Sequence, residues 1–139
     1  RAIDKILSKS VRKETRMYHH QFLAATPFTG GGLKVGDVMT IAPMQQLQDD
    51  YEDFETNFYK DLFNKRVMNG DHRWWGFSKI INKNDNALSI STHTAWNMFI
   101  EGKELKWPED FTSKKIMEIT PDARKMYNPI QLTLVYVAD

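Results

Sequence analysis

The side chains best suited to chemistry gather between residues 69 and 99, which hold three of the four tryptophans and two of the four histidines. His93 is the first candidate, because an imidazole can donate or accept a proton near neutral pH. On an alternating strand His93 shares its face with Ser91, and the more apolar opposite face is expected to pack under helices. We therefore predict that His93 is a catalytic residue on a pocket wall. The alternative is a hydrogen-bonded histidine on a polar strand face.

The neighbours Trp74 and Trp75 must point to opposite faces of a strand. If Trp75 packs beneath a helix with Phe77, Trp74 faces the pocket, and Gly76 leaves room for a ligand there. Core or interface packing is the alternative for both tryptophans. The predicted core set is Trp75, Phe77, Ile90 and Trp96, and the predicted pocket wall is Trp74, Gly76, Ser91 and His93. Ligand-binding roles are predicted for Trp74, Ser91 and Tyr136.

Several kinds of site are not expected. The chain has no cysteine, so thiolate metal sites and disulfides are excluded. Adjacent His19 and His20 on a helix diverge too far to share a metal, and residues 29–32 (TGGG) lack the lysine and hydroxyl of a phosphate loop. We predict no metal site and no cofactor. A net charge of +1 gives no field for nucleic acid, and no apolar run has the length of a membrane span.

The periodicity of apolar residues predicts the elements that position these side chains. Glycine, proline and asparagine clusters mark the breaks between them. In chain order we expect a helix over 2–25, a flexible joint at 29–32, a strand over 36–44, a helix over 45–70, strands over 72–81 and 87–96 joined by a turn at 82–86, a helical region over 108–127 interrupted at Pro121, and a strand over 131–138.

This order predicts an α+β fold: a ferredoxin-like βαββαβ arrangement with a four-stranded antiparallel sheet and two helices on one face, preceded by an N-terminal helix. We predict two parts, with the helix and joint in residues 1–28 and the ferredoxin-like domain in residues 33–139. The second sheet face would remain uncovered, so a partner sheet or a bound ligand is expected on it.

The segment DYEDFETNFYKDLFNKRVMNGDHRWWGFSKI, together with STHTAWNMF, resembles the dimeric α+β barrel superfamily and its antibiotic-biosynthesis-monooxygenase-like branch. The resemblance covers residues 36–139 and extends to bacterial proteins that carry tandem units of this type. It implies a barrel made by two sheets, from a homodimer or a tandem second unit, around a small hydrophobic ligand. It also implies cofactor-independent oxygenation of an aromatic substrate held against Trp74, with His93 or Tyr136 assisting proton removal.

Two functions from different classes are therefore expected. One is a small-molecule-binding barrel with monooxygenase-like chemistry, and the other is a non-enzymatic structural or interaction module of a larger tandem or oligomeric protein. A cone-shaped polyketide-cyclase type of fold is a weaker alternative, because a strand over 36–44 does not fit it. Since the chain begins at Arg1, we expect a processed product or part of a longer chain, located in the cytoplasm or exported after removal of a signal.

Overall fold

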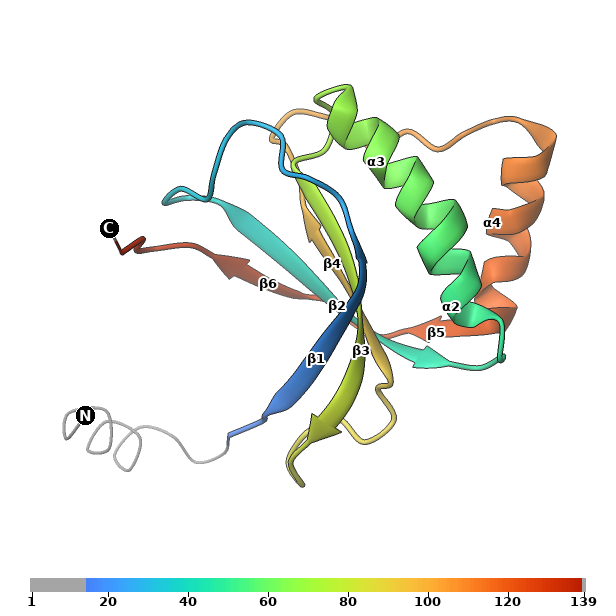
Figure 1. Cartoon of the computed structure of the whole chain (residues 1–139), viewed down its shortest axis with the longest axis horizontal. Helices are drawn as coiled ribbons and strands as arrows, with labels where there is room; N and C mark the ends of the chain where they lie inside the picture. The colour runs from blue at the N-terminus through green and yellow to red at the C-terminus, as the bar shows by residue number, and fades with distance from the viewer. Residues whose placement is uncertain (1–14, 139) are drawn as a thin grey trace.

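A single antiparallel sheet with helices on one side forms the structure, a computed structural model that describes residues 15–138 (Figure 1). The fold is therefore α+β with an antiparallel sheet, as predicted, but the sheet has six strands and not the four that were expected. The six strands are β1 (Tyr18–Ala25), β2 (Val38–Gln46), β3 (Trp74–Lys83), β4 (His93–Met98), β5 (Arg124–Met126) and β6 (Ile130–Thr133). The first helix runs without a break through α2 (Tyr51–Asp53), the π-helical turn η1 (Phe54–Tyr59) and α3 (Lys60–Met68), and the second is α4 (Phe111–Ala123).

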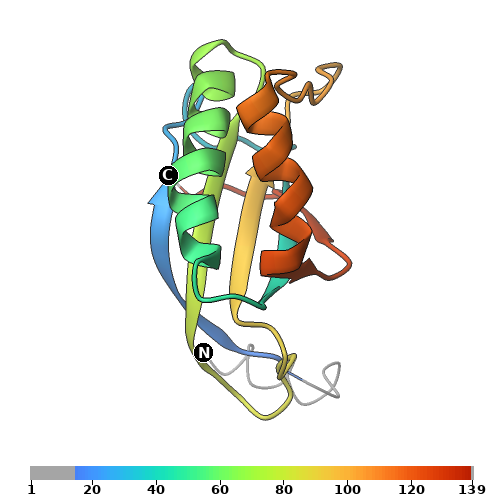
Figure 2. The same cartoon turned by 90° about the vertical axis from the view of Figure 1, so that its right-hand side faces the viewer.

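The strands are arranged in the order β1-β3-β4-β2-β5, and β6 also pairs with β2. β5 pairs with the end of β2 and β6 with its beginning, so two short strands share one edge of β2. Both helices cover the same face of the sheet, as the two views show (Figures 1 and 2). The other face, which carries Phe22, Trp74 and Trp96 at its centre, has no helix of the described chain on it and is called the open face.

Aromatic side chains fill the space between the helices and the sheet. The rings of Phe63 on α3 and Trp75 on β3 stack with centroids 5.5 Å apart, and Tyr51 meets Phe77 edge to face at 5.6 Å. Opposite them, Ala42 and Ala95 pair across β2 and β4 and are both buried. Small residues at the centre of this face let the large rings reach the backbone of the sheet.

The first helix presents a line of inward side chains at four-residue steps: Tyr51, Glu55, Tyr59 and Phe63 are all buried. In a regular α-helix, a step of four residues drifts around the axis by about 40°. The wider π-helical turn of η1 rotates less for each residue and offsets this drift. The turn therefore keeps all four side chains directed at the sheet.

The predicted helix over 2–25 is wrong for residues 18–25, which form β1. Tyr18 and Phe22 are four residues apart, a spacing that suits both a helix face and alternate positions of a strand. With His20 between them, the three side chains follow the two-residue period of β1. Residues 2–14 of that prediction lie outside the described residues. The division into residues 1–28 and 33–139 stays a prediction, although β1 is paired with β3 in the same sheet.

The other predicted elements differ from the structure mainly at their ends. The strand predicted over 36–44 corresponds to β2, and the helix predicted over 45–70 begins only at Tyr51. The expected interruption at Pro121 does not occur, because α4 continues through it to Ala123. The strand predicted over 131–138 is β6, which ends at Thr133.

Candidate functional site

Four aromatic rings form the centre of the open face. Phe22 on β1 lies between Trp74 and Trp96, with ring centroids 6.2 and 5.6 Å away. Phe28 stacks on the outer side of Trp74 at 5.4 Å with the two planes 10° apart. Phe22 and Phe28 are 50% and 43% exposed although they belong to this cluster. Phe22 is tilted by 57° to Trp74 and by 38° to Trp96, so the rings present an uneven aromatic surface that is partly exposed to solvent.

Gly76 sets the position of Trp74 within this cluster. A Cβ atom at Gly76 would lie 2.7 Å from the Trp74 ring and 3.0 Å from the Phe22 ring. Both distances are shorter than normal carbon contacts, so only glycine lets the indole fold over the strand. Gly76 was expected to leave room for a ligand on the face of Trp74, but the indole of Trp74 itself occupies that space.

A polar group of three residues lies beside the aromatic rings. The indole N–H of Trp96 donates to Ser78 Oγ at 2.8 Å, and His20 Nδ1 lies 2.9 Å from the same oxygen. Ser78 is completely buried, whereas the ring of His20 also contacts Trp96 edge to face at 5.1 Å. Burial lowers the pKa of His20, so its imidazole is neutral near pH 7. The open face thus combines the apolar surface of the aromatic rings with one neutral imidazole.

Aliphatic side chains continue the open face toward β6. Pairing across the strands places Ile130 beside Ile41, and Leu132 beside Met39. Ile130 and Leu132 are about half exposed, and a hollow of about 320 Å³ lies next to Leu132. The open face comprises His20, Phe22, Phe28, Met39, Ile41, Trp74, Gly76, Ser78, Trp96, Met98, Ile130 and Leu132.

The predicted site residues do not lie together. Trp74 is on the open face, as predicted, but His93 is on the helix-covered face and only 1% exposed. Ser91 is buried in the turn that precedes β4, and Tyr136 is exposed in the segment after β6. The predicted pocket wall that combined Trp74 with His93 is therefore wrong, since the sheet separates the two side chains.

The error concerns which alternate side chains of β4 face the helices. The strand begins at His93 rather than at residue 87, and Ile90 lies in the preceding turn, 42% exposed. Trp96, expected in the core, pairs with Gly76 on the open face, whereas His93 and Ala95 face the helices. The helix-covered face takes the small alanine because the rings of the first helix pack directly on it. The polar His93 is accommodated on this face because the carboxylate of Glu52 on the first helix hydrogen-bonds it.

His93 has a defined environment under the first helix. Its Nε2 lies 2.8 Å from Glu52 Oε1, and its Nδ1 lies 2.8 Å from Thr92 Oγ1. The ring stacks on Phe77 with centroids 5.3 Å apart and meets Tyr51 edge to face at 5.2 Å. Both nitrogens are therefore engaged, and the ring cannot rotate. Neither Glu52 nor Thr92 was predicted, although the hydroxyl-histidine run STHT was a signal.

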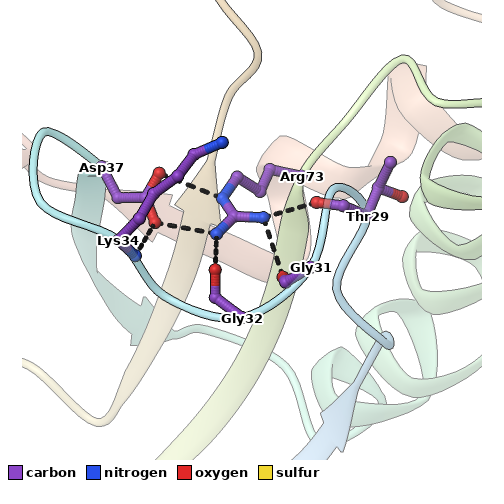
Figure 3. A network of polar contacts seen from close by, with 6 residues as sticks. All are labelled: Thr29, Gly31, Gly32, Lys34, Asp37 and Arg73. Atoms are coloured by element: carbon purple, nitrogen blue, oxygen red, sulfur yellow. Dashed lines mark hydrogen bonds and ion pairs between the residues drawn. The ribbon is translucent and has the colours of Figure 1, made fainter. Parts of the chain in front are cut away.

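The predicted flexible joint is also wrong, because residues 29–36, named the glycine loop, wrap around Arg73 (Figure 3). The guanidinium donates to the carbonyl oxygens of Thr29, Gly31 and Gly32 and makes two bonds to the Asp37 carboxylate. Arg73 and Asp37 have side chains that are 7% and 8% exposed. This pairing lowers the pKa of Asp37. Glycines supply the backbone freedom that brings successive carbonyls onto one cation.

A second histidine, His72, is completely buried where the first helix meets β4. Its Nε2 lies 2.9 Å from the Asn97 Oδ1, and burial lowers its pKa from 6.5 to about 4. As the pH falls below 6.5, the unfolded chain takes up a proton at this residue before the folded chain does. The free energy of unfolding should therefore decrease from about pH 6.5 to pH 4, by up to about 3 kcal/mol.

This expectation can be measured by urea denaturation at several pH values for the native chain, His72→Gln and His19→Gln. The stability difference between the native chain and His72→Gln should shrink as the pH falls through this range. The exposed His19 serves as the control, and its replacement should leave the profile unchanged. A constant difference between the native chain and His72→Gln would contradict a neutral buried imidazole.

Within residues 15–138, no helix has the length and apolar character of a membrane span, and no three His, Asp or Glu side chains converge as a metal site. No protein-family model, curated protein or solved structure matches the chain.

Proposed function

We propose that this chain is a small-molecule-binding domain whose open face binds an apolar, aromatic ligand. The main support for this proposal is the aromatic cluster of Phe22, Phe28, Trp74 and Trp96. It is partly exposed and continuous with the aliphatic residues of β2 and β6. Soluble proteins rarely expose so much contiguous apolar surface unless something binds there. The flat rings favour an aromatic ligand, and His20 offers it one polar partner.

We further propose that a second copy of the chain covers the ligand with its own sheet. From β2 to β5 the order is strand, helix, strand, strand, helix, strand, and these strands run β3-β4-β2-β5 in the sheet. Both features support a ferredoxin-like arrangement that could close a barrel with a second sheet. The open faces of two copies would bring like apolar surfaces together, and a two-fold pairing makes each surface its own partner.

The aromatic rings should determine ligand affinity. Titration with the fluorescent probe 1-anilinonaphthalene-8-sulfonate should give saturable binding, and Trp96→Ala should weaken it at least about tenfold, which corresponds to about 1.4 kcal/mol of lost stacking. Phe111 on α4 is the matched control, because its ring is 80% exposed but lies outside the open face. Phe111→Ala should bind the probe like the native chain. Equal affinities of all three proteins would contradict the proposal.

A non-enzymatic interaction module remains the second candidate, favoured by the half-exposed aliphatic residues Ile130 and Leu132 at the edge of the open face. Sedimentation of the native chain and Phe22→Glu separates the two functions. A dimer that Phe22→Glu converts to a monomer, with saturable probe binding, supports the enclosed ligand site. A dimer that binds no probe supports the interaction module. The cofactor-independent oxygenation implied by the resemblance needs a substrate held against Trp74 beside His93 or Tyr136, and His93 lies on the opposite face from Trp74.

A further inference from the structure

A second, open cavity lies next to His93. It has a volume of about 470 Å³ and is lined by residues from the ends of β2, β3 and the turn before β4. Thr92, half-buried, and Lys79 are among them, and Lys79 pairs with His93 across the two strands. The lining residues of β3 are its last five, at the opposite end of the strand from Trp74, so a site there is distinct from the aromatic cluster of the open face.

Hydrogen-bond roles at this cavity are determined by the chemistry of the groups. An ionised Glu52 only accepts, so His93 Nε2 carries a proton and donates it to Oε1 at 2.8 Å. Burial lowers the pKa of His93 and keeps the ring neutral near pH 7, which leaves Nδ1 as an acceptor. The Thr92 hydroxyl must then donate to Nδ1 at 2.8 Å. The backbone N–H of Gln46 donates to the same hydroxyl oxygen and fixes its position.

The result is a continuous hydroxyl–imidazole–carboxylate chain at the wall of a cavity. This is the arrangement by which a base activates a hydroxyl nucleophile and a carboxylate orients the base. We propose that the cavity is an ester-hydrolysing site in which Thr92 is the nucleophile, His93 its general base and Glu52 the positioning residue. The substrate class is a small carboxylic ester that fits the cavity beside Lys79.

In the first step Thr92 Oγ1 forms a bond to the acyl carbon, and its proton passes to His93 Nδ1. The bond between the acyl carbon and the alkoxy oxygen breaks, and that oxygen leaves as an alcohol with the proton from Nδ1. A water then attacks the acyl carbon while Nδ1 takes its proton, and the bond to Oγ1 breaks as Thr92 regains that proton. The net reaction converts an ester and water into a carboxylic acid and an alcohol.

Two groups help this sequence electrostatically. Glu52 stays bonded to Nε2–H and stabilises the imidazolium that forms when Nδ1 takes the proton. The Lys79 ammonium belongs to the cavity wall, where it is available to the carbonyl oxygen that becomes negative during the attack. The Glu52–His93 bond also connects the first helix with β4, and the Gln46–Thr92 bond connects β2 with the segment before β4. The test must therefore separate a chemical role from a structural one.

Covalent labelling distinguishes a chemical role of these residues from a structural one. A fluorophosphonate probe should form one adduct per folded native chain, mapped to Thr92 by peptide mass spectrometry, and the chain should hydrolyse 4-nitrophenyl acetate. Thr92→Ala should lose the adduct. Glu52→Gln, at a partly exposed position, should keep the fold but lower kcat by at least about 100-fold with little change in KM. Thr92→Ser should retain both labelling and hydrolysis.

Thr112→Ala on α4 is the control, since Thr112 is exposed and lies outside the chain of hydrogen bonds. It should label like the native chain. Thermal melting of every variant shows which are folded, and Glu52→Gln and Thr92→Ser still test the proposal if Thr92→Ala does not fold. Absence of an adduct on the folded native chain would overturn the proposal. Labelling that persists unchanged in Glu52→Gln would do so as well.

Discussion

Replacement of Arg124 by methionine should lower the free energy of unfolding by about 3–5 kcal/mol, because it leaves the buried Glu55 carboxylate without its oppositely charged partner. Glu55 is 1% exposed and its Oε1 accepts from both the Arg124 guanidinium and the Tyr51 hydroxyl. Burial raises the pKa of Glu55, and the arginine opposes this rise. Urea denaturation at pH 7 measures the loss.

A double variant and a surface control test the cause. Glu55→Gln combined with Arg124→Met removes both charges and keeps an acceptor for Tyr51, so it should regain at least half of the lost stability. Lys65→Met removes an exposed partner of Asp61, 3.1 Å away, and should cost less than about 0.5 kcal/mol. If Arg124→Met were no more harmful than Lys65→Met, the buried pair would have no structural importance.

Arg73→Met should cost about 3–4 kcal/mol and release the glycine loop. The change leaves the Asp37 carboxylate unpaired and removes the donor of three carbonyl oxygens (Figure 3). Phe28 should then lose its fixed position on Trp74, because the Arg73 guanidinium also lies over its ring at 5.7 Å. Hydrogen exchange of residues 29–37, measured by mass spectrometry, should accelerate together with the loss of stability.

Two further variants show whether geometry or charge holds this loop. Lysine at position 73 keeps the charge but lacks the planar set of five N–H donors, so Arg73→Lys should lie between the native chain and Arg73→Met. Lys34→Met removes a cation of the same loop while its backbone N–H still donates to Asp37 at 2.8 Å. It should exchange at the native rate. Rapid exchange in Lys34→Met would show that the loop depends on net charge instead.

The sequence predicted the parts of the fold in which local and tertiary preferences agree. The first helix was predictable because Tyr51 and Phe58 recur with a helical period and acidic residues precede basic ones. Its fully buried line was predicted only at Tyr51, because Phe58 is partly buried and the line continues through Glu55, Tyr59 and Phe63. Trp75 and Phe77 were correctly assigned to the core, and Trp74 to the other face, since alternation along β3 is regular. These residues obey rules that depend only on their neighbours in the chain.

The candidate site was predicted only in part, for reasons that lie outside local sequence. Which side chains of β4 face the helices depends on Glu52, a residue about forty positions away. Its carboxylate hydrogen-bonds His93 and so makes a buried position acceptable for this histidine. The glycine loop looked flexible because its organising cation, Arg73, is equally distant in sequence. His20 was missed because β1 resembles a helix in its spacing. Each error concerns a residue whose partner comes from another element.

The two ends of β3 share one arrangement: a basic side chain that gathers carbonyl oxygens from a neighbouring loop. Arg73 binds three carbonyls of residues 29–32, and the Lys83 ammonium binds those of Leu88, Ser89 and Ser91 at 2.7–3.1 Å. Glycine- and serine-rich loops usually tolerate inserted tags or new chain termini, but tolerance depends on whether the loop backbone is hydrogen-bonded. For protein engineering, these two loops are consequently among the least suitable places in the molecule to open the chain.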